Sequence, residues 1–226
     1  MVVLLQHEVP LDLGSSMPGP EPIRSIDPGT LDGAALYRLC TSLVVPRPIA
    51  WVSTINSEGQ ANLAPFSFFN AVSDQPAVLM VSIGARRDRE KDTLRNIRQT
   101  RCFAVHVVDD RLARAMNITA TDYPPGTNEF EAAGLISVPC SRIAAPRVQD
   151  AAACLECELL ELIPVPGTTF TMALGQVVMV HVQERCLGPS GTASTEALRP
   201  VGKLALNDYT RLGEVFKLVR PRLGQS

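Results

Sequence analysis

Short apolar runs separated by turn residues occupy the middle of the chain. The segment 49–55 is rich in β-branched and aromatic residues, the Asn-Ser-Glu-Gly segment 56–59 is typical of a turn, and 60–64 returns to an extended pattern. Together these segments predict a β-hairpin. The nearly continuous apolar run 77–83, which a proline and a glycine bound, predicts a strand buried on both faces.

The longest predicted strands lie in the second half of the chain. The segments 154–163 and 170–183 flank the turn Pro164-Val-Pro-Gly167 and are expected to form a hairpin. A further strand is predicted over 102–108 from its apolar, β-branched pattern. Strands outnumber helices and no strand–helix–strand rhythm repeats. This favours a mainly β fold, an antiparallel β-barrel or sandwich with peripheral helices.

Helical spacing occurs in fewer segments. Apolar residues between 31 and 40 fall near helical spacing, and Asp27 or Thr30 is the expected cap of that helix. Further helices are predicted over 91–100, 111–116, 129–133 and 207–218.

The chain is expected to comprise an arm and one domain. Residues 1–28 are rich in Pro, Gly and Ser without a sustained period, which predicts an irregular N-terminal arm. Residues 29–226 are within the size of a single domain. The apolar run Val2 to Leu5 is too short for a signal peptide or a membrane span, and no stretch approaches the roughly 18 apolar residues that a spanning helix needs. No membrane association is expected, and the predicted location is the cytoplasm.

Charge and cysteine usage narrow the possible functions. Lys and Arg number 21 and Asp and Glu number 23, for a net charge of -2, whereas nucleic-acid binders usually carry a basic surplus. No nucleic-acid partner is therefore expected. The six cysteines lack the spacing of a disulfide framework, so free thiols are expected. Cys154 and Cys157 are three positions apart on a predicted strand and would face opposite sides, so no metal site is predicted.

An aromatic segment and a basic segment are the two candidate binding regions. The run Asn62-Leu-Ala-Pro-Phe-Ser-Phe-Phe-Asn-Ala71 combines three phenylalanines with hydrogen-bonding residues, and Pro65 is expected to interrupt central strand pairing there. Such a segment suits either a planar heteroaromatic ligand or an aromatic cluster under a loop. The run Arg86-Arg-Asp-Arg-Glu-Lys-Asp-Thr93 precedes a predicted helix, where amides and basic side chains suit either a phosphate or plain solvation.

Several familiar enzyme classes lack their motifs in this chain. There is no GxGxxG before a helix and no GxxxxGK[ST], so neither the dinucleotide-binding fold nor the phosphate-binding loop of nucleotide triphosphatases is supported. No GxSxG nucleophile elbow is present. His106 and His181 lie within apolar strand patterns, which favours structural histidines over catalytic ones, and the catalytic residues stay unknown.

Three motifs in order carry a family resemblance: Pro46-Arg-Pro-Ile-Ala-Trp-Val-Ser-Thr54, then 62–73, then Lys91-Asp-Thr-Leu-Arg-Asn-Ile97. The chain resembles the flavin reductase-like, FMN-binding split-barrel family over about residues 30–215. Further matches are Asn128-Glu-Phe-Glu131, Gly134-Leu135, Pro146-Arg147, Leu155-Glu-Cys157 and Gly175-Gln-Val-Val178.

The resemblance implies a six-stranded antiparallel barrel that forms a homodimer and binds FMN at or near the subunit interface. Residues that resemble those lining the isoalloxazine and ribityl chain are Ser53, Thr54, Asn62, Leu63, Ala64, Ser67, Phe68, Phe69 and Asn70, and those that resemble the phosphate-side contacts are Ser82, Lys91, Asp92 and Thr93.

The expected function is an oxidoreductase that passes reducing equivalents between NADH or NADPH and flavin, so that the protein orients the reactants in a dry pocket. Two alternatives stay open: a non-catalytic flavin- or haem-binding module, and a reductase component that supplies reduced flavin to a separate oxygenase partner. One departure bears on the choice. Relatives commonly carry Arg-Leu-Gly-Gly-x-x-Tyr where this chain reads Lys203-Leu-Ala-Leu-Asn-Asp-Tyr209, and the added side chains of Ala205 and Leu206 are expected to narrow the site.

Overall fold

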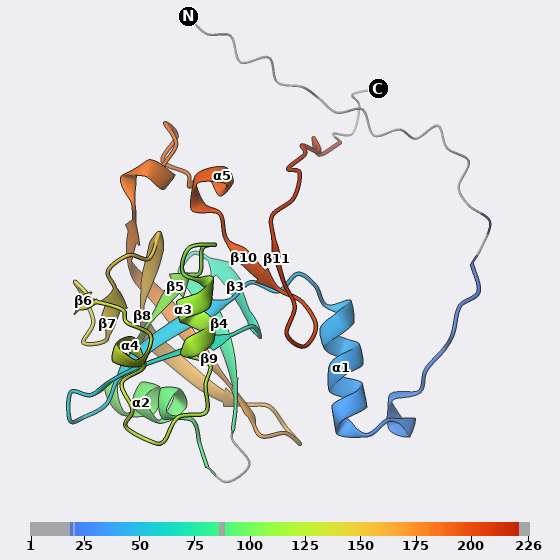
Figure 1. Ribbon diagram of the computed structural model, residues 1–226, viewed down its shortest axis with the longest axis horizontal. Coiled ribbons are helices and arrows are strands. Elements are labelled where there is room, and N and C mark those ends of the chain that lie inside the picture. The colour runs from blue at the N-terminus through green and yellow to red at the C-terminus, as the bar shows by residue number, and fades with distance from the viewer. Residues whose placement is uncertain (1–18, 20, 86–88, 222–226) are drawn as a thin grey trace, which may run out of the picture.

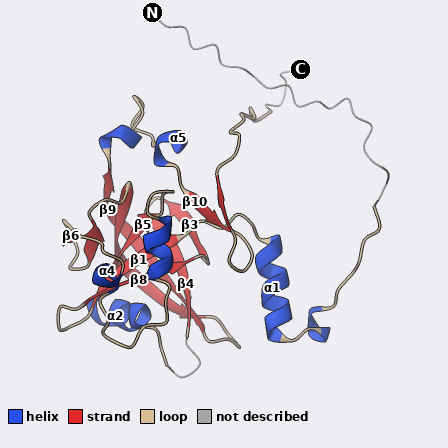
Figure 2. Cartoon of the chain, in the orientation of Figure 1, coloured by secondary structure: helices blue, strands red, loops and turns tan. Residues whose placement is uncertain are grey.

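A single antiparallel sheet of seven strands organises the protein, in the order β2-β1-β5-β8-β9-β4-β3. The computed structural model describes residues 19, 21–85 and 89–221. The sheet curls on itself, so that β2 also contacts β4, and helices lie around it (Figures 1 and 2). Its strands are β1 (Ala50–Ile55), β2 (Ala61–Phe66), β3 (Phe69–Asp74), β4 (Ala77–Gly84), β5 (Cys102–Val107), β8 (Ala153–Pro164) and β9 (Phe170–Val182). Two small ladders pair β6 (Ser137–Pro139) with β7 (Pro146–Val148), and β10 (Val201–Lys203) with β11 (Tyr209–Arg211).

The predicted mainly β, antiparallel architecture is confirmed. The hairpin of β1 and β2 is present with the expected turn, and β8 and β9 form the long second hairpin. The expectation that Pro65 interrupts strand pairing is wrong, because Pro65 lies within β2 opposite Trp51. β2 ends the strand order of the sheet, where a proline without an N–H is tolerated.

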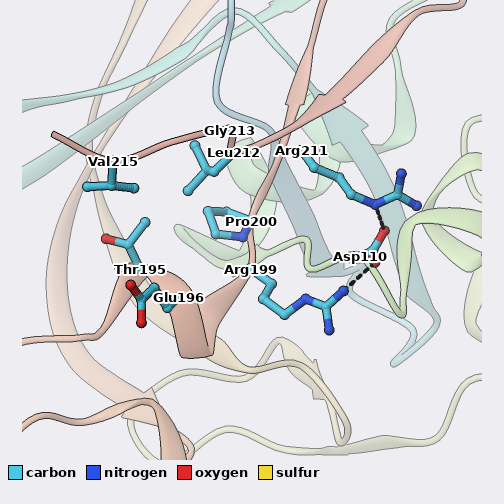
Figure 3. Close-up of a pocket in the computed structure, with 9 residues that line it drawn as sticks. All are labelled: Asp110, Thr195, Glu196, Arg199, Pro200, Arg211, Leu212, Gly213 and Val215. Atoms are coloured by element: carbon cyan, nitrogen blue, oxygen red, sulfur yellow. Dashed lines mark hydrogen bonds and ion pairs between the residues drawn. The ribbon is translucent and has the colours of Figure 1, made fainter. Parts of the chain in front are cut away.

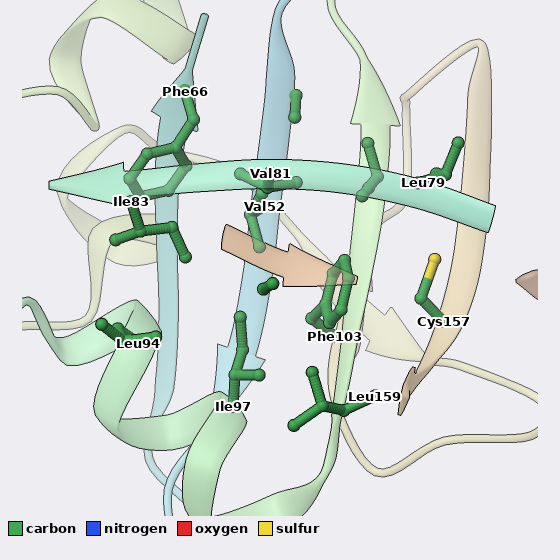
Figure 4. Packing of buried hydrophobic residues seen from close by; sticks show 13 residues of the cluster. Val52, Phe66, Leu79, Val81, Ile83, Leu94, Ile97, Phe103, Cys157 and Leu159 are labelled. Atoms are coloured by element: carbon green, nitrogen blue, oxygen red, sulfur yellow. The ribbon is translucent and has the colours of Figure 1, made fainter. Parts of the chain in front are cut away.

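Two apolar clusters form on the two faces of β1 and β2. Inside the curled sheet, Val52, Val81 and Phe103 pack together, and Ile97 of helix α2 (Asp92–Thr100) closes one end (Figure 4). On the outer face, Trp51 and other apolar side chains are covered by helices and by β7. The alternation of side chains along each strand thus assigns neighbouring residues to opposite clusters.

The helices are mostly short and peripheral. α2 packs against β1 and β2, and α3 and α4 also contact β2. Both caps expected for the first helix are wrong: Asp27 caps a preceding 3-10 turn, and Asp32 caps α1 by accepting from the amide of Ala35 at 2.6 Å. The helices are η1 (Pro28–Thr30), α1 (Gly33–Leu43), α2 (Asp92–Thr100), α3 (Ala113–Ile118), α4 (Glu129–Ala132), η2 (Glu184–Cys186) and α5 (Thr195–Leu198).

The helix predicted over 207–218 is also wrong. Residues 209–211 form β11, which pairs with β10, and the described chain beyond it is irregular. The apolar residues that suggested a helical face, including Leu212, Val215 and Phe216, are exposed. A helix there would have no core surface of this protomer to pack against, and tertiary packing supplies most of the stability of such helices.

Residues at the N-terminus fall largely outside the described part of the chain. Of the predicted arm, Gly19 and residues 21–28 are described, and they are exposed. Among the described helices, none combines the length and the apolar character that crossing a bilayer requires.

Candidate functional site

The short link between β2 and β3 places two of the predicted residues, Ser67 and Phe68, at the surface of the curled sheet. The Phe68 carbonyl accepts a hydrogen bond from the amide of Ser82 on β4 at 2.8 Å, which fixes the link over that strand. The Phe68 ring stacks on Phe170 of β9, with ring centroids 5.7 Å apart, and lies 6.5 Å from the Tyr37 ring of α1. Three distant parts of the chain therefore supply one aromatic group.

Two cavities lie beside this link and share Ser67 and Phe68. The first, of about 250 Å³, has the aromatic group and Lys91 on its walls. The second, of about 390 Å³, extends toward the C-terminal end of α1. The first is lined by Tyr37, Pro65, Phe66, Ser67, Phe68, Ser82, Gly84, Ala85, Lys91 and Phe170, and the second by Cys40, Thr41, Val44, Pro46, Arg47, Pro48, Ser67, Phe68, Phe69, Asn70 and Met80.

Lys91 brings a positive charge to the first cavity at the start of α2. It occupies the N-cap position, and its side chain makes no capping bond. The ammonium lies 5.0 Å from the centroid of the Phe66 ring, a cation–π distance. Asp92, the first helical residue, forms an ion pair with Arg95 at 2.6 Å. Arg86 and Arg87 of the basic segment lie outside the described residues.

A buried polar network ties the start of α2 to the hairpin of β1 and β2. The Asn62 side-chain amide donates to the Thr93 hydroxyl at 3.1 Å, and the Asn96 amide donates to the Thr54 hydroxyl at 3.1 Å. All four side chains are buried. The network holds the helix start, and Lys91 with it, in a fixed position beside β2.

The structure does not bring every predicted side chain to the cavities. Ser53 and Leu63 point to the outer face, because side chains alternate along β1 and β2. The Ser53 hydroxyl donates to the Pro146 carbonyl at 2.5 Å, and Leu63 is part of the outer apolar cluster. Ala64 packs against the inner cluster. The predicted residues that line the two cavities are Ser67, Phe68, Phe69, Asn70, Ser82 and Lys91.

Among the cavity residues that sequence reasoning missed, Tyr37, Phe170 and Arg47 offer binding chemistry. Gly84 could have indicated the approach of Phe170, because a Cβ at position 84 would lie 2.8 Å from the Phe170 ring. Glycine at this position lets the ring approach the backbone of β4. Arg47 stands in the quoted motif at 46–54 but had no role assigned to it. Its guanidinium is buried and donates to the Ser67 hydroxyl at 3.4 Å.

The two internal histidines have structural surroundings. His106 is completely buried, its Nδ1 lies 2.8 Å from the Trp51 carbonyl oxygen, and its Nε2 accepts from the amide of Val148 at 3.0 Å. Burial lowers the pKa of His106 to about 4, so the ring is neutral at pH 7. His181 pairs with the buried Glu156 at 2.5 Å. Within the described residues no group of His, Cys, Asp and Glu is arranged to hold a metal ion.

A further cavity, of about 300 Å³, lies between α5 and the segment after β11 (Figure 3). Three of its charged groups, Asp110, Arg199 and Arg211, are joined in ion pairs. The Asp110 carboxylate accepts from Arg199 at 2.8 Å and from Arg211 at 2.6 Å. Because both arginines are engaged by Asp110 and largely exposed, this cavity has less binding chemistry to offer than the pair beside Phe68.

Known proteins resemble this chain over most of its length. A nitrilotriacetate monooxygenase component B from Bacillus cereus is 34% identical with a TM-score of 0.85, covering 88% of this chain and 100% of that chain. A 2-nitrobenzoate 2-nitroreductase from Pseudomonas fluorescens is 31% identical with a TM-score of 0.82, covering 90% and 99%. An uncharacterized protein of Aquifex aeolicus (strain VF5) is 40% identical over 181 residues, which is 80% of this chain and 91% of that protein.

The family match agrees with the fold. Residues 42–198 match the Flavin reductase like domain, and they include every strand of the main sheet. The solved structures above share that sheet, and another neighbour is itself described as a flavin reductase with a split-barrel domain. This chain belongs to the flavin reductase-like family of split-barrel proteins.

Proposed function

We propose that the protein binds FMN beside the β2–β3 link and passes reducing equivalents between NADH or NADPH and the flavin. The observation that carries the proposal is the pair of cavities that share Ser67 and Phe68. They offer an aromatic wall, hydroxyl groups and one lysine within a protein of the flavin reductase-like family. Their volumes of about 250 and 390 Å³ are of the order of small-molecule sites.

The residues present fit the parts of FMN. A planar ring system packs favourably against aromatic faces such as those of Phe68 and Phe170. The Ser67 and Ser82 hydroxyls line the same cavity and suit the polar edge of the ring or the ribityl chain. Lys91 would bind the phosphate as a point charge, and the first free amides of α2 would complete its hydrogen bonds. Thr93 would contribute by holding Asn62, since its hydroxyl already accepts from that side chain.

The protein's share of the chemistry is to orient the reactants and to exclude water. Bound flavin supplies the hydride-accepting group. The Phe68–Phe170 stack fixes one wall of the cavity, and the Ser82–Phe68 hydrogen bond holds the link that carries it. His106 takes no part in proton transfer at the cavities, because both of its ring nitrogens are engaged on the outer face of β1.

A second candidate function has a specific observation in its favour. The 34% identical relative from Bacillus cereus is the component B of a monooxygenase, which supports a role as a reductase component that supplies reduced flavin to a separate oxygenase. The altered run at 203–206 favours neither candidate decisively. Leu206 is 59% exposed, so its side chain leaves the cavities of this protomer open.

We also propose that the protein acts as a homodimer. In Figure 1, α1 stands to one side of the barrel, and Thr41 is its only buried residue. Apolar side chains are exposed on this helix, on the edge strand β3 and on the segment after β11; they include Tyr37, Leu43, Val72, Phe216 and Leu218. Exposed apolar surface of this extent is typical of an interface, and a second copy would cover it next to the shared cavities.

The remaining proposals concern the chain's organisation and location. The one-domain assignment, 29–226 after an arm of 1–28, is supported by a single continuous main sheet and by a family match that falls wholly inside it. A cytoplasmic location is supported by six free cysteines, four of them buried, since disulfides are rare in that reducing compartment.

Replacing Lys91 tests the proposed site. Lys91→Ala should weaken FMN binding by about 1.5–3 kcal/mol, or roughly 10- to 150-fold in Kd, because one charge-assisted contact is lost. Flavin fluorescence during titration measures the change. Arg114→Ala is the matched control, since Arg114 is exposed on α3, which covers the outer face of the sheet. Equal affinities of Lys91→Ala and wild type would remove Lys91 from the site.

A further inference from the structure

A fourth cavity, of about 370 Å³, lies on the far side of the barrel from the proposed flavin site. It is bounded by β7 and by the paired ends of β8 and β9 near Ala153 and Val182. Phe170, which lines the flavin cavity, begins β9, and His181 of this cavity lies eleven residues further along, roughly 36 Å at the rise of a strand. Its walls are Arg147, Val148, Gln149, Ala151, Cys154, Val180, His181, Val182 and Gln183.

The lining is basic and contains no carboxylate. Arg147 and His181 are its ionisable nitrogen groups, and neither Asp nor Glu is among the lining residues. Within the described part of the chain, the Arg147 side chain forms no salt bridge, and its Nε is buried without a hydrogen-bond partner. A guanidinium in a partly buried place normally has an anionic partner, because desolvating it is costly.

The buried carboxylate beside His181 is engaged by other groups. Glu156 is fully buried on β8 and accepts from the backbone amides of Ser141 and Arg142 at 2.6 and 2.7 Å. His181 Nε2 lies 2.5 Å from the same carboxylate. These three contacts hold the pKa of Glu156 below its usual value although burial alone would raise it. Glu156 is therefore engaged by these three contacts, and it forms no ion pair with Arg147.

His106 next to the cavity supplies no counter-charge to Arg147. The neighbouring His106 is kept neutral chiefly by its burial, and the Arg147 charge lowers its pKa further. Arg147 thus lines the cavity without an ion-pair partner among the described residues. An unpaired guanidinium in a cavity selects for a ligand that is negatively charged at one end.

We propose that this cavity binds a small organic carboxylate. The carboxylate faces Arg147, whose planar guanidinium is suited to that group, and the ring of His181 lines the same wall. The remainder of the ligand lies between β7 and the paired ends of β8 and β9. This site is separate from the proposed flavin site and does not depend on flavin binding there.

Calorimetric titration of the full-length protein with benzoate tests the proposal. We expect saturable binding of one benzoate per chain, weakened at least 10-fold in Arg147→Met, because a charge-assisted contact of about 1.5–3 kcal/mol is lost. Benzamide has the same shape without the charge and should bind wild type at least 10-fold more weakly. Arg142→Met is the matched control: Arg142 is exposed in the loop before β7 and contributes its backbone amide, not its side chain, to Glu156.

The outcomes separate this proposal from the proposed function. Lys91→Ala should bind benzoate as wild type does, even if it loses FMN. Absence of saturable benzoate binding to wild type overturns the proposal. A carboxylate of a partner protein that already pairs with Arg147 would give the same result and would equally overturn it. Equal binding of benzoate and benzamide also overturns it, and that comparison needs no variant to fold.

Discussion

Replacing Arg47 should release α1 and loosen the β2–β3 link together. The buried Arg47 guanidinium donates to the carbonyls of Thr41 and Val44 at the end of α1, at 2.6 and 2.7 Å, and to the carbonyl of Leu204 in the β10–β11 turn at 2.8 Å. A fourth, longer bond of 3.4 Å reaches Ser67. Since Thr41 is the only buried residue of α1, this one side chain supplies much of what holds the helix to the barrel.

The size of the effect follows from these contacts. A hydrogen bond to a charged group contributes about 1.5–3 kcal/mol net, so the three short bonds would sum to roughly 4.5–9 kcal/mol if they were independent. Val44 is exposed, so water can replace part of the loss at the helix end. We therefore expect Arg47→Met to reduce the free energy of unfolding by about 3–5 kcal/mol, near the upper end for single substitutions.

Urea unfolding of wild type and variant measures this free energy, and limited proteolysis reports whether α1 is released first. Arg38→Met on the exposed face of α1 is the matched control and should change stability by less than about 0.5 kcal/mol. Arg47→Lys should recover only part of the loss, because an ammonium cannot reach three carbonyls in the geometry of a guanidinium. A loss below 1 kcal/mol in Arg47→Met, with α1 protected as in wild type, would refute this reasoning.

Three further predictions concern the barrel and its turns. Gly175→Ala should lower the free energy of unfolding by about 1–3 kcal/mol in urea, because the added Cβ would overlap the buried Phe103 ring; no loss would contradict the packing. Leu206→Gly should raise it by up to about 1 kcal/mol, since Leu206 has a φ of 48°, and an unchanged midpoint would contradict strain there. His106 has a pKa of about 4 in the folded protein against 6.5 in the unfolded chain, so the unfolded chain binds more protons between these pH values. The free energy of unfolding of wild type should therefore fall by about 3 kcal/mol as the pH falls from 6.5 to 4. His106→Gln should lack that part of the loss, and parallel stability–pH curves for the two proteins would contradict it.

The sequence predicted most of the strands because their patterns are local. Alternation and turn chemistry located the hairpin of β1 and β2 and the hairpin of β8 and β9. Local patterns failed where tertiary context decides. Pro65 is accepted because β2 ends the strand order, which the sequence near Pro65 does not reveal. The segment 207–218 has helical spacing, but β11 takes its first residues and the rest finds no surface in this protomer.

The candidate site was predicted unevenly for the same reason. Contiguous residues such as Ser67 and Phe68 share a cavity because they lie in one link of the chain. Val52, the neighbour of Ser53 on β1, points to the inner face of the sheet, but alternation directs the Ser53 side chain to the outer face. Phe170 reaches the first cavity from more than a hundred residues beyond Phe68. Arg47 reaches the second cavity from a buried position. Nothing in the local sequence of either residue indicates this approach.

The central claim is tested most directly by the absorbance spectrum of the purified protein from about 300 to 600 nm with added FMN, followed by NADH and then NADPH without oxygen. The account predicts that FMN binds at one per chain and that its visible absorbance bleaches with at least one of the two nucleotides. Bound FMN that stays oxidised with both would contradict the proposed electron transfer, and absence of FMN binding would contradict the proposed site as well.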